Sequence, residues 1–219
     1  MAKSFGDTKG GAIKRDSGYV MKDGENTLRL VGGVLPRYVY WLKGTNNKDI
    51  PIESLSFDRD LEKFTNIEND GVQDTFGRDK KCSWAYSINC IDPTDGKVKV
   101  FNLKKKLYEQ IMTAAEDLGD PTDPQTGWDI VFKKVKTGPL PFNVEYTLNV
   151  LRCKKRALTE VEIAAVAAAP TIDSVYPRPT PEETRALCEK IKNGQAEEEE
   201  GSGQDSSTLA EVVNELDNA

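Results

Sequence analysis

Lysines alternate with an aromatic residue along the segment from Lys97 to Lys106, and this pattern suits the binding of nucleic acid. Lys97, Lys99 and Phe101 share one face of an expected strand, and three further lysines follow at 104–106. Lysine ammonium groups attract phosphates, and an aromatic ring stacks on an unpaired base whatever its identity. These residues leave one alternative open, a solvated basic hairpin with Phe101 in the core.

Local signals place this segment in a strand, a hairpin, a second strand and a helix. Two alternating stretches flank residues 92–96, whose sequence DPTDG is rich in turn formers. Leu107, Ile111 and Leu118 then recur at helical spacing, which is more typical of core packing than of a binding face.

Three other stretches combine basic and aromatic residues. Alternation in residues 35–43 places one tryptophan with two cations on one face, residues 128–136 form a basic strand, and an aromatic loop follows that strand. In residues 82–88 the aromatic residues alternate with apolar ones, so an internal position is an open alternative for them. The candidate contacts to single-stranded DNA are Arg37, Trp41, Lys43, Trp84, Tyr86, Lys99, Phe101, Lys104, Lys105, Lys133, Lys134 and Phe142.

The order of elements predicts a mainly β protein with the fold of an OB-fold barrel that carries inserted and C-terminal helices. An α+β sheet domain is the alternative. Gly32 and Gly33 indicate a bulge or bend, and residues 58–69 predict a short helix that packs Leu61, Phe64 and Ile67 into the core. We expect a flexible arm at 1–26, the DNA-binding core at 27–156, a helical extension at 157–194 and a disordered acidic tail at 195–219. Within the extension, Thr180 and Glu183 form an expected capping box, with Pro181 in the first turn.

The acidic residues are concentrated at the C-terminal end. The chain has a formal charge of −6, yet residues 197–219 contain eight acids and no base, which leaves 28 acids against 30 bases in residues 1–196. Such a tail can fold over a basic surface, and its apolar residues recur at helical spacing, a pattern suited to a partner's groove. The candidate partner-binding residues are Glu197, Glu198, Glu199, Glu200, Leu209, Val212, Val213 and Leu216.

Composition argues against several other functions. The 219 residues include no histidine, and the four cysteines form no C-x-x-C pair, so we expect no zinc, no other metal and no cofactor. A nucleophile–histidine pair is impossible, and no G-x-x-x-x-G-K-[ST] loop occurs, which disfavours an enzyme. No apolar run is long enough to span a membrane, so we expect a soluble, intracellular protein.

From Ser83 to Ile111 the chain resembles the T-even-type bacteriophage single-stranded-DNA-binding family. The stretch SWAYSINCIDPTDGKVKVFNLKKKLYEQI matches the family's tryptophan strand, acidic-proline turn, lysine-rich strand with an aromatic residue, and amphipathic helix. Weaker similarity runs through residues 28–43, 127–146 and 170–193 and into the tail. The resemblance implies that Phe101 stacks on a base, that Lys104 and Lys105 lie beside the DNA, and that Phe142 sits in a loop bearing another stacking residue.

The resemblance also implies a role in coating DNA during phage replication, recombination and repair in the host cell cytoplasm, with an acidic tail that contacts replication and recombination proteins. Two features depart from the family. The interval from Asp58 to Lys81 lacks the histidine and three cysteines of the family's zinc subdomain, and the mixed-charge arm matches its N-terminal self-association motif poorly. A replication scaffold and an RNA-binding OB-fold protein are the alternative functions.

Overall fold

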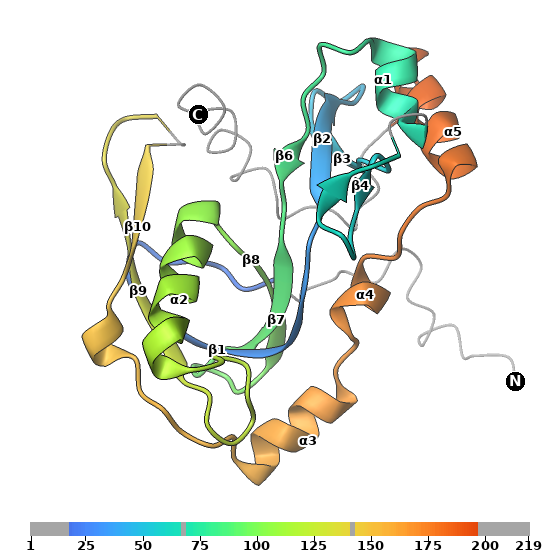
Figure 1. The fold of residues 1–219 in the computed structure, drawn as a ribbon. Coiled ribbons are helices and arrows are strands. Elements are labelled where there is room, and N and C mark those ends of the chain that lie inside the picture. The colour runs from blue at the N-terminus through green and yellow to red at the C-terminus, as the bar shows by residue number, and fades with distance from the viewer. Residues whose placement is uncertain (1–17, 67–68, 141–142, 197–219) are drawn as a thin grey trace, which may run out of the picture.

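The computed structural model describes residues 18–66, 69–140 and 143–196, which form two antiparallel sheets, a small hairpin and several helices (Figure 1). The predicted mainly β class is confirmed. In chain order the elements are β1 (Gly24–Leu35), β2 (Tyr38–Lys43), β3 (Asp49–Glu53), β4 (Phe57–Asp58), β5 (Lys63–Phe64), α1 (Gly71–Phe76), β6 (Ser83–Trp84), β7 (Ser87–Ile91), β8 (Val98–Asn102), α2 (Lys105–Leu118), β9 (Asp129–Lys136), β10 (Val144–Leu148), the 3₁₀-helix η3 (Val150–Arg152), α3 (Glu160–Ala168), α4 (Ile172–Val175) and α5 (Pro181–Lys192).

The larger sheet has five antiparallel strands in the order β10-β9-β1-β7-β8, and α2 lies across one of its faces (Figure 1). Leu107 and Ile111 of α2 pack with Leu28, Phe132 and other buried residues between helix and sheet. The predicted hairpin and helix are therefore confirmed. The described strands form an open sheet, and no closed barrel is found among them.

Each edge of this open sheet is contacted by another segment of the chain. At the β10 edge, the Gln110 side chain of α2 donates to the carbonyl of Tyr146 (3.0 Å) and accepts from the backbone N–H of Leu148 (2.8 Å). At the β8 edge, the backbone N–H of Tyr19 donates to the carbonyl of Val100 at 2.7 Å. Unpaired strand edges invite association with other chains, and these contacts occupy part of each edge without closing a barrel.

Strand β1 carries the chain from the larger sheet into a smaller one, ordered β3-β2-β6. The predicted irregularity at Gly32 and Gly33 is confirmed, because the β1–β7 register shifts between Val31 and Leu35 and Gly32 has a φ of 75°. The smaller sheet packs with α1 and α5, which lie side by side, around a separate apolar core (Figure 1).

The C-terminal segment crosses the face of the larger sheet opposite α2. Leu158 packs on Val31 and Ile91, and Ile172 of α4 packs on Leu35 and Val100. The predicted capping box of α5 is confirmed at Thr180, with Pro181 in the first turn.

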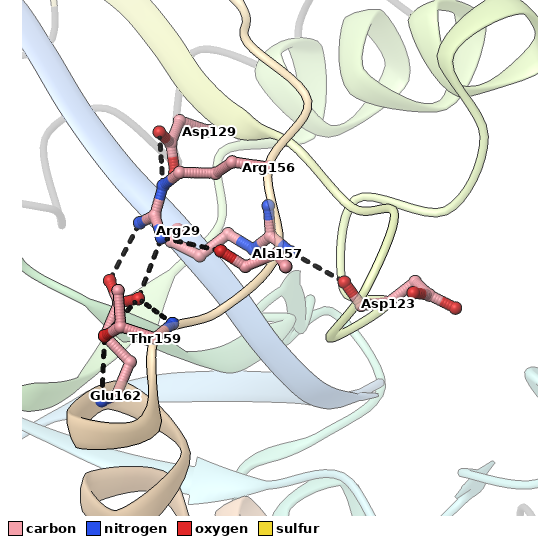
Figure 2. A network of polar contacts seen from close by, with 7 residues as sticks. All are labelled: Arg29, Asp123, Asp129, Arg156, Ala157, Thr159 and Glu162. Carbon is pink, nitrogen blue, oxygen red and sulfur yellow. Dashed lines mark hydrogen bonds and ion pairs between the residues drawn. The ribbon is translucent and has the colours of Figure 1, made fainter.

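Arg156 fastens this segment to the sheet (Figure 2). Its Nε donates to Asp129 of β9 at 2.8 Å, and its Nη1 and Nη2 each donate to Glu162 of α3 at 2.8 Å. Glu162 also completes the capping box of α3 with Thr159. The fork of donors on Arg156 therefore joins a strand to a helix start.

The predicted helix at residues 58–69 is wrong for the part that the structure describes. Residues 57–64 form the β4–β5 hairpin, in which Phe57 pairs with Phe64 and Asp58 with Lys63. Leu61 is 61% exposed and Phe64 48% exposed, so neither is a core residue, while Ile67 lies outside the described residues. The helical spacing of these residues was fortuitous, because pairing of the phenylalanines across the hairpin decided the local structure.

Candidate nucleic-acid interface

Six aromatic side chains from separate segments gather between the smaller sheet and α2. This aromatic row consists of Tyr38, Phe57, Phe64, Trp84, Tyr86 and Tyr108. Its two halves meet where Tyr38 of β2 stands directly opposite Trp84 of β6, since opposite residues of an antiparallel pair share a face.

The first half is built by the β4–β5 hairpin and the start of β2. The ring centroid of Tyr38 lies 4.7 Å from that of Phe57 and 5.0 Å from that of Phe64, and the two phenylalanine rings lie 5.2 Å apart. Phe57 is buried, Tyr38 is half-buried and Phe64 is exposed. Phe57 therefore supports two rings that reach the surface.

The second half joins the start of β6 to the first turns of α2. Trp84 stacks on Tyr86 with ring centroids 4.3 Å apart and an interplanar angle of 18°, and Tyr108 lies 5.7 Å from Trp84. Tyr86 is only 6% exposed, whereas Trp84 and Tyr108 are half-buried. Tyr86 thus supports Trp84, and the partly exposed rings of Trp84 and Tyr108 can meet a base.

The hydroxyl of Tyr86 donates to Oε2 of Glu62 at 2.6 Å. Burial raises the pKa values of Tyr38, Tyr86 and Tyr108, and the charge of nearby Glu62 raises all three further. The three phenols therefore stay neutral at ordinary pH and add no negative charge to a surface that would meet phosphates.

Three lysines begin α2 beside the second half of the row. Lys105 and Lys106 are exposed, and Lys104 is the half-buried residue that precedes the first turn. The first turn of α2 contains no acid, and no side chain caps it. Because the partial positive charge at a helix N-terminus adds to that of the lysines, this end of α2 favours phosphate. The fold thus brings the predicted residues Trp84, Lys104 and Lys105 together.

The prediction that Phe101 stacks on a base is corrected. Its side chain is 0% exposed and lies in the core with Tyr19 and Phe132, whose ring centroids are 5.6 Å and 6.0 Å away. Val100 on the other face of β8 is also buried, under α4. Both faces of this strand are covered, so the alternation of its residues did not indicate a solvent-facing side.

Arg37 and Lys99 are engaged within the protein. The guanidinium of Arg37 lies 3.7 Å from the ring centroid of Tyr176 and donates to Oγ of Ser87 at 3.2 Å. Nζ of Lys99 forms ion pairs with Asp92 (2.7 Å) and Asp95 (2.9 Å), both in the predicted turn. These contacts hold both side chains against the protein and away from the aromatic row, so their DNA contacts stay a prediction.

The other predicted residues are spread over the molecule. Trp41 is half-buried with a buried Nε1, and Lys43 is exposed and pairs with Asp49 at 2.7 Å. Lys133 and Lys134 follow one another in β9 and so point to opposite faces of the sheet. The fold does not bring these four residues to the aromatic row. Their contacts with DNA stay a prediction. Phe142 and the tail residues lie outside the described residues.

Sequence reasoning missed Tyr38, Phe64 and Tyr108. Tyr108 directly follows Leu107 of the predicted helical stripe, and Phe64 was taken for a helical core residue. Four segments separated in the chain contribute to the row, and a period measured within one segment carries no information about its neighbours in space.

The sequence is similar to that of a known phage protein. No family model matches the sequence. It is 27% identical, over 231 residues, to a protein of Escherichia phage T5 described as "Probable ssDNA-binding protein", and the match covers 89% of this chain and 88% of that protein. Within the described residues, no helix is long and apolar enough to cross a membrane.

Proposed function

We propose that this chain is a sequence-nonspecific single-stranded-DNA-binding protein of a bacteriophage, and that the aromatic row and the lysines at the start of α2 form its DNA-contacting surface. The observation that carries the proposal is the placement of partly exposed, mutually supported rings next to a helix start that bears three cations. The similarity to the phage T5 protein supports the same conclusion over most of the chain.

In this mechanism, the phosphates follow Lys104, Lys105 and Lys106 while bases lie against Trp84 and Tyr108. Stacking needs only the flat face of a base, so it tolerates any sequence, and each stacked base contributes about 1–3 kcal/mol. The hydroxyls and rings behind the surface hold the stacking rings in place before DNA arrives, which lowers the ordering cost of binding.

The wider role follows from such binding. The protein coats and protects single strands during replication, recombination and repair in the host cell cytoplasm, and it acts without catalysis. Its acidic tail recruits replication and recombination proteins, and copies associate along the strand. The helix inserted between β8 and β9 and the bulge in β1 support an OB-type arrangement of the β core.

The lysines provide the first test. Labelled oligo-dT is titrated by fluorescence anisotropy at several salt concentrations, with the double variant Lys105→Gln/Lys106→Gln and the matched control Lys154→Gln/Lys155→Gln, all four being exposed lysines. The slope of log K against log salt is negative, and its magnitude should decrease by about 0.7 for each phosphate that α2 no longer neutralises. The slope should stay unchanged in the control.

Equal slopes in both variants would refute the placement of DNA at α2. Duplex DNA and RNA of equal length are titrated alongside. Absence of binding to oligo-dT at low salt by the folded protein would refute the function itself and favour a replication scaffold, while stronger binding to RNA would favour an RNA-binding protein.

A further inference from the structure

A cleft of about 340 Å³ adjoins the aromatic row. Tyr86 and Tyr108 form part of its lining, together with a short apolar wall at 34–36, the tip of the β4–β5 hairpin and Asp173 of α4. This volume is at the lower end of the range for ligand-binding clefts, which suits one flat base better than a longer segment of chain.

The charge of this cleft is opposite to that of the lysines at α2. Arg59, Asp60, Glu62 and Asp173 are its charged residues, and the charge of Arg59 is already balanced. Its Nε and Nη2 donate to the two carboxylate oxygens of Glu53 at 2.7 and 2.5 Å. Among the described residues no ion pair neutralises the other three acids, so the cleft repels phosphate and can accept only an uncharged or cationic group.

Glu62 is the acid best placed to meet a base in this cleft. Its Oε2 accepts the hydroxyl of Tyr86 at 2.6 Å, and its backbone at the hairpin tip adopts a φ of 48°. A left-handed conformation is uncommon for a residue other than glycine and is kept where the surroundings hold it. The hairpin thus holds a carboxylate at the edge of the rings on which bases would stack.

We propose, on the basis of the function proposed above, that this cleft receives one base of the bound strand by its amino edge and so favours cytosine over thymine. A carboxylate only accepts hydrogen bonds. Cytosine presents the N4 amino group as a donor at the position where thymine presents the O4 acceptor. At this position Glu62 therefore attracts the amino group of cytosine and repels the O4 of thymine, while the two pyrimidines stack with similar area.

The sugar and phosphate of this nucleotide stay outside the cleft, on the side of Lys105 and Lys106. The acidic cleft beside the rings thus receives the uncharged base, and the basic start of α2 next to the cleft attracts the phosphates. The preference acts at one nucleotide among those bound, so the protein as a whole still binds any sequence.

The experiment compares oligo-dC with oligo-dT of equal length, short enough to bind one protein, at pH 8 and constant salt. The full-length protein should bind oligo-dC about fivefold more tightly, a modest ratio because one solvent-accessible hydrogen bond distinguishes the two. Glu62→Gln should bring the ratio close to one, because an amide both accepts from cytosine and donates to thymine.

Glu109→Gln is the matched control. Glu109 is an exposed acid of α2 next to Tyr108 but outside the cleft lining, so its variant removes the same charge near the same ring. Glu109→Gln should bind both oligonucleotides somewhat more tightly with an unchanged ratio, and only Glu62→Gln should change the dC to dT ratio. Binding of both oligonucleotides with a ratio at or below one, or a ratio unchanged in Glu62→Gln, would overturn the inference while leaving the proposed function standing. Failure to bind either oligonucleotide would refute the proposed function.

Discussion

Replacing Trp84 and Phe101 by leucine separates a surface ring from a core ring. Trp84 is half-buried and stacks on Tyr86, whereas Phe101 has no exposed surface. Both substitutions remove an aromatic ring and keep an apolar side chain. If bases stack where the structure exposes rings, only the change at Trp84 should weaken DNA binding directly.

The magnitudes follow from what each ring touches. Loss of one base stack at Trp84 costs about 1–3 kcal/mol of binding free energy, or about 5- to 150-fold in Kd. Phe101→Leu removes packing against Tyr19 and Phe132, so it should lower stability, by less than the roughly 3–5 kcal/mol of a phenylalanine-to-alanine change in a core. Its Kd for oligo-dT should stay close to that of the wild type while the protein is folded.

Anisotropy titrations with labelled oligo-dT measure Kd, and thermal unfolding followed by circular dichroism shows that each variant is folded at the titration temperature. Trp84→Phe keeps a stacking ring and should restore most of the affinity that Trp84→Leu removes. A folded Phe101→Leu protein whose affinity falls as far as that of Trp84→Leu would refute the assignment of the stacking surface to the aromatic row.

Two further predictions concern the C-terminal part of the chain. Hydrogen bonds from Arg156 lower the pKa of Glu162 from 4.5 to about 2, so its stabilising contribution is present above pH 4.5 and is lost as the pH falls towards 2. Glu162→Gln should therefore lower Tm at pH 7, and the difference in Tm from the wild type should shrink as the pH falls towards 2. The exposed residue Glu160 gives the control Glu160→Gln. A Tm difference that is the same at neutral and acid pH, or one as large in the control, would contradict the role of this ion pair. Deletion of residues 197–219 keeps Ala196, whose carbonyl accepts hydrogen bonds from Thr45. The deletion should tighten oligo-dT binding at low salt and have little effect at high salt. Unchanged affinity across salt would show that the tail does not screen the DNA-binding surface.

Elements with strong local signals could be predicted from the sequence. The DPTDG turn and its flanking strands, the helix that begins near Lys105 and the capping box at Thr180 all depend on residues within a few positions of one another. The lysines at the start of α2 belong to the same group, because a helix boundary alone places them together. These are the parts of the fold and of the candidate site for which neighbours in sequence are neighbours in space.

The faces of strands could not be assigned in the same way. Alternation along β8 predicted a buried and an exposed side, but the C-terminal segment covers the second face, so Phe101 and Val100 are both buried. The spacing of Leu61 and Phe64 predicted a helix, but pairing of Phe57 with Phe64 formed a hairpin instead. Contacts between segments far apart in the chain decided each case.

The sequence by itself therefore determined the β-rich class, the central hairpin and helix, and the chemistry of lysines with aromatic rings. Only the tertiary structure decided which rings face solvent and which positive charges are already paired with acids inside the protein. Burial and ion pairing are properties of neighbours in space, and the neighbours Trp84 and Tyr108 come from segments 24 residues apart in the chain. The same physics placed Phe101 in the core and Lys99 between two aspartates.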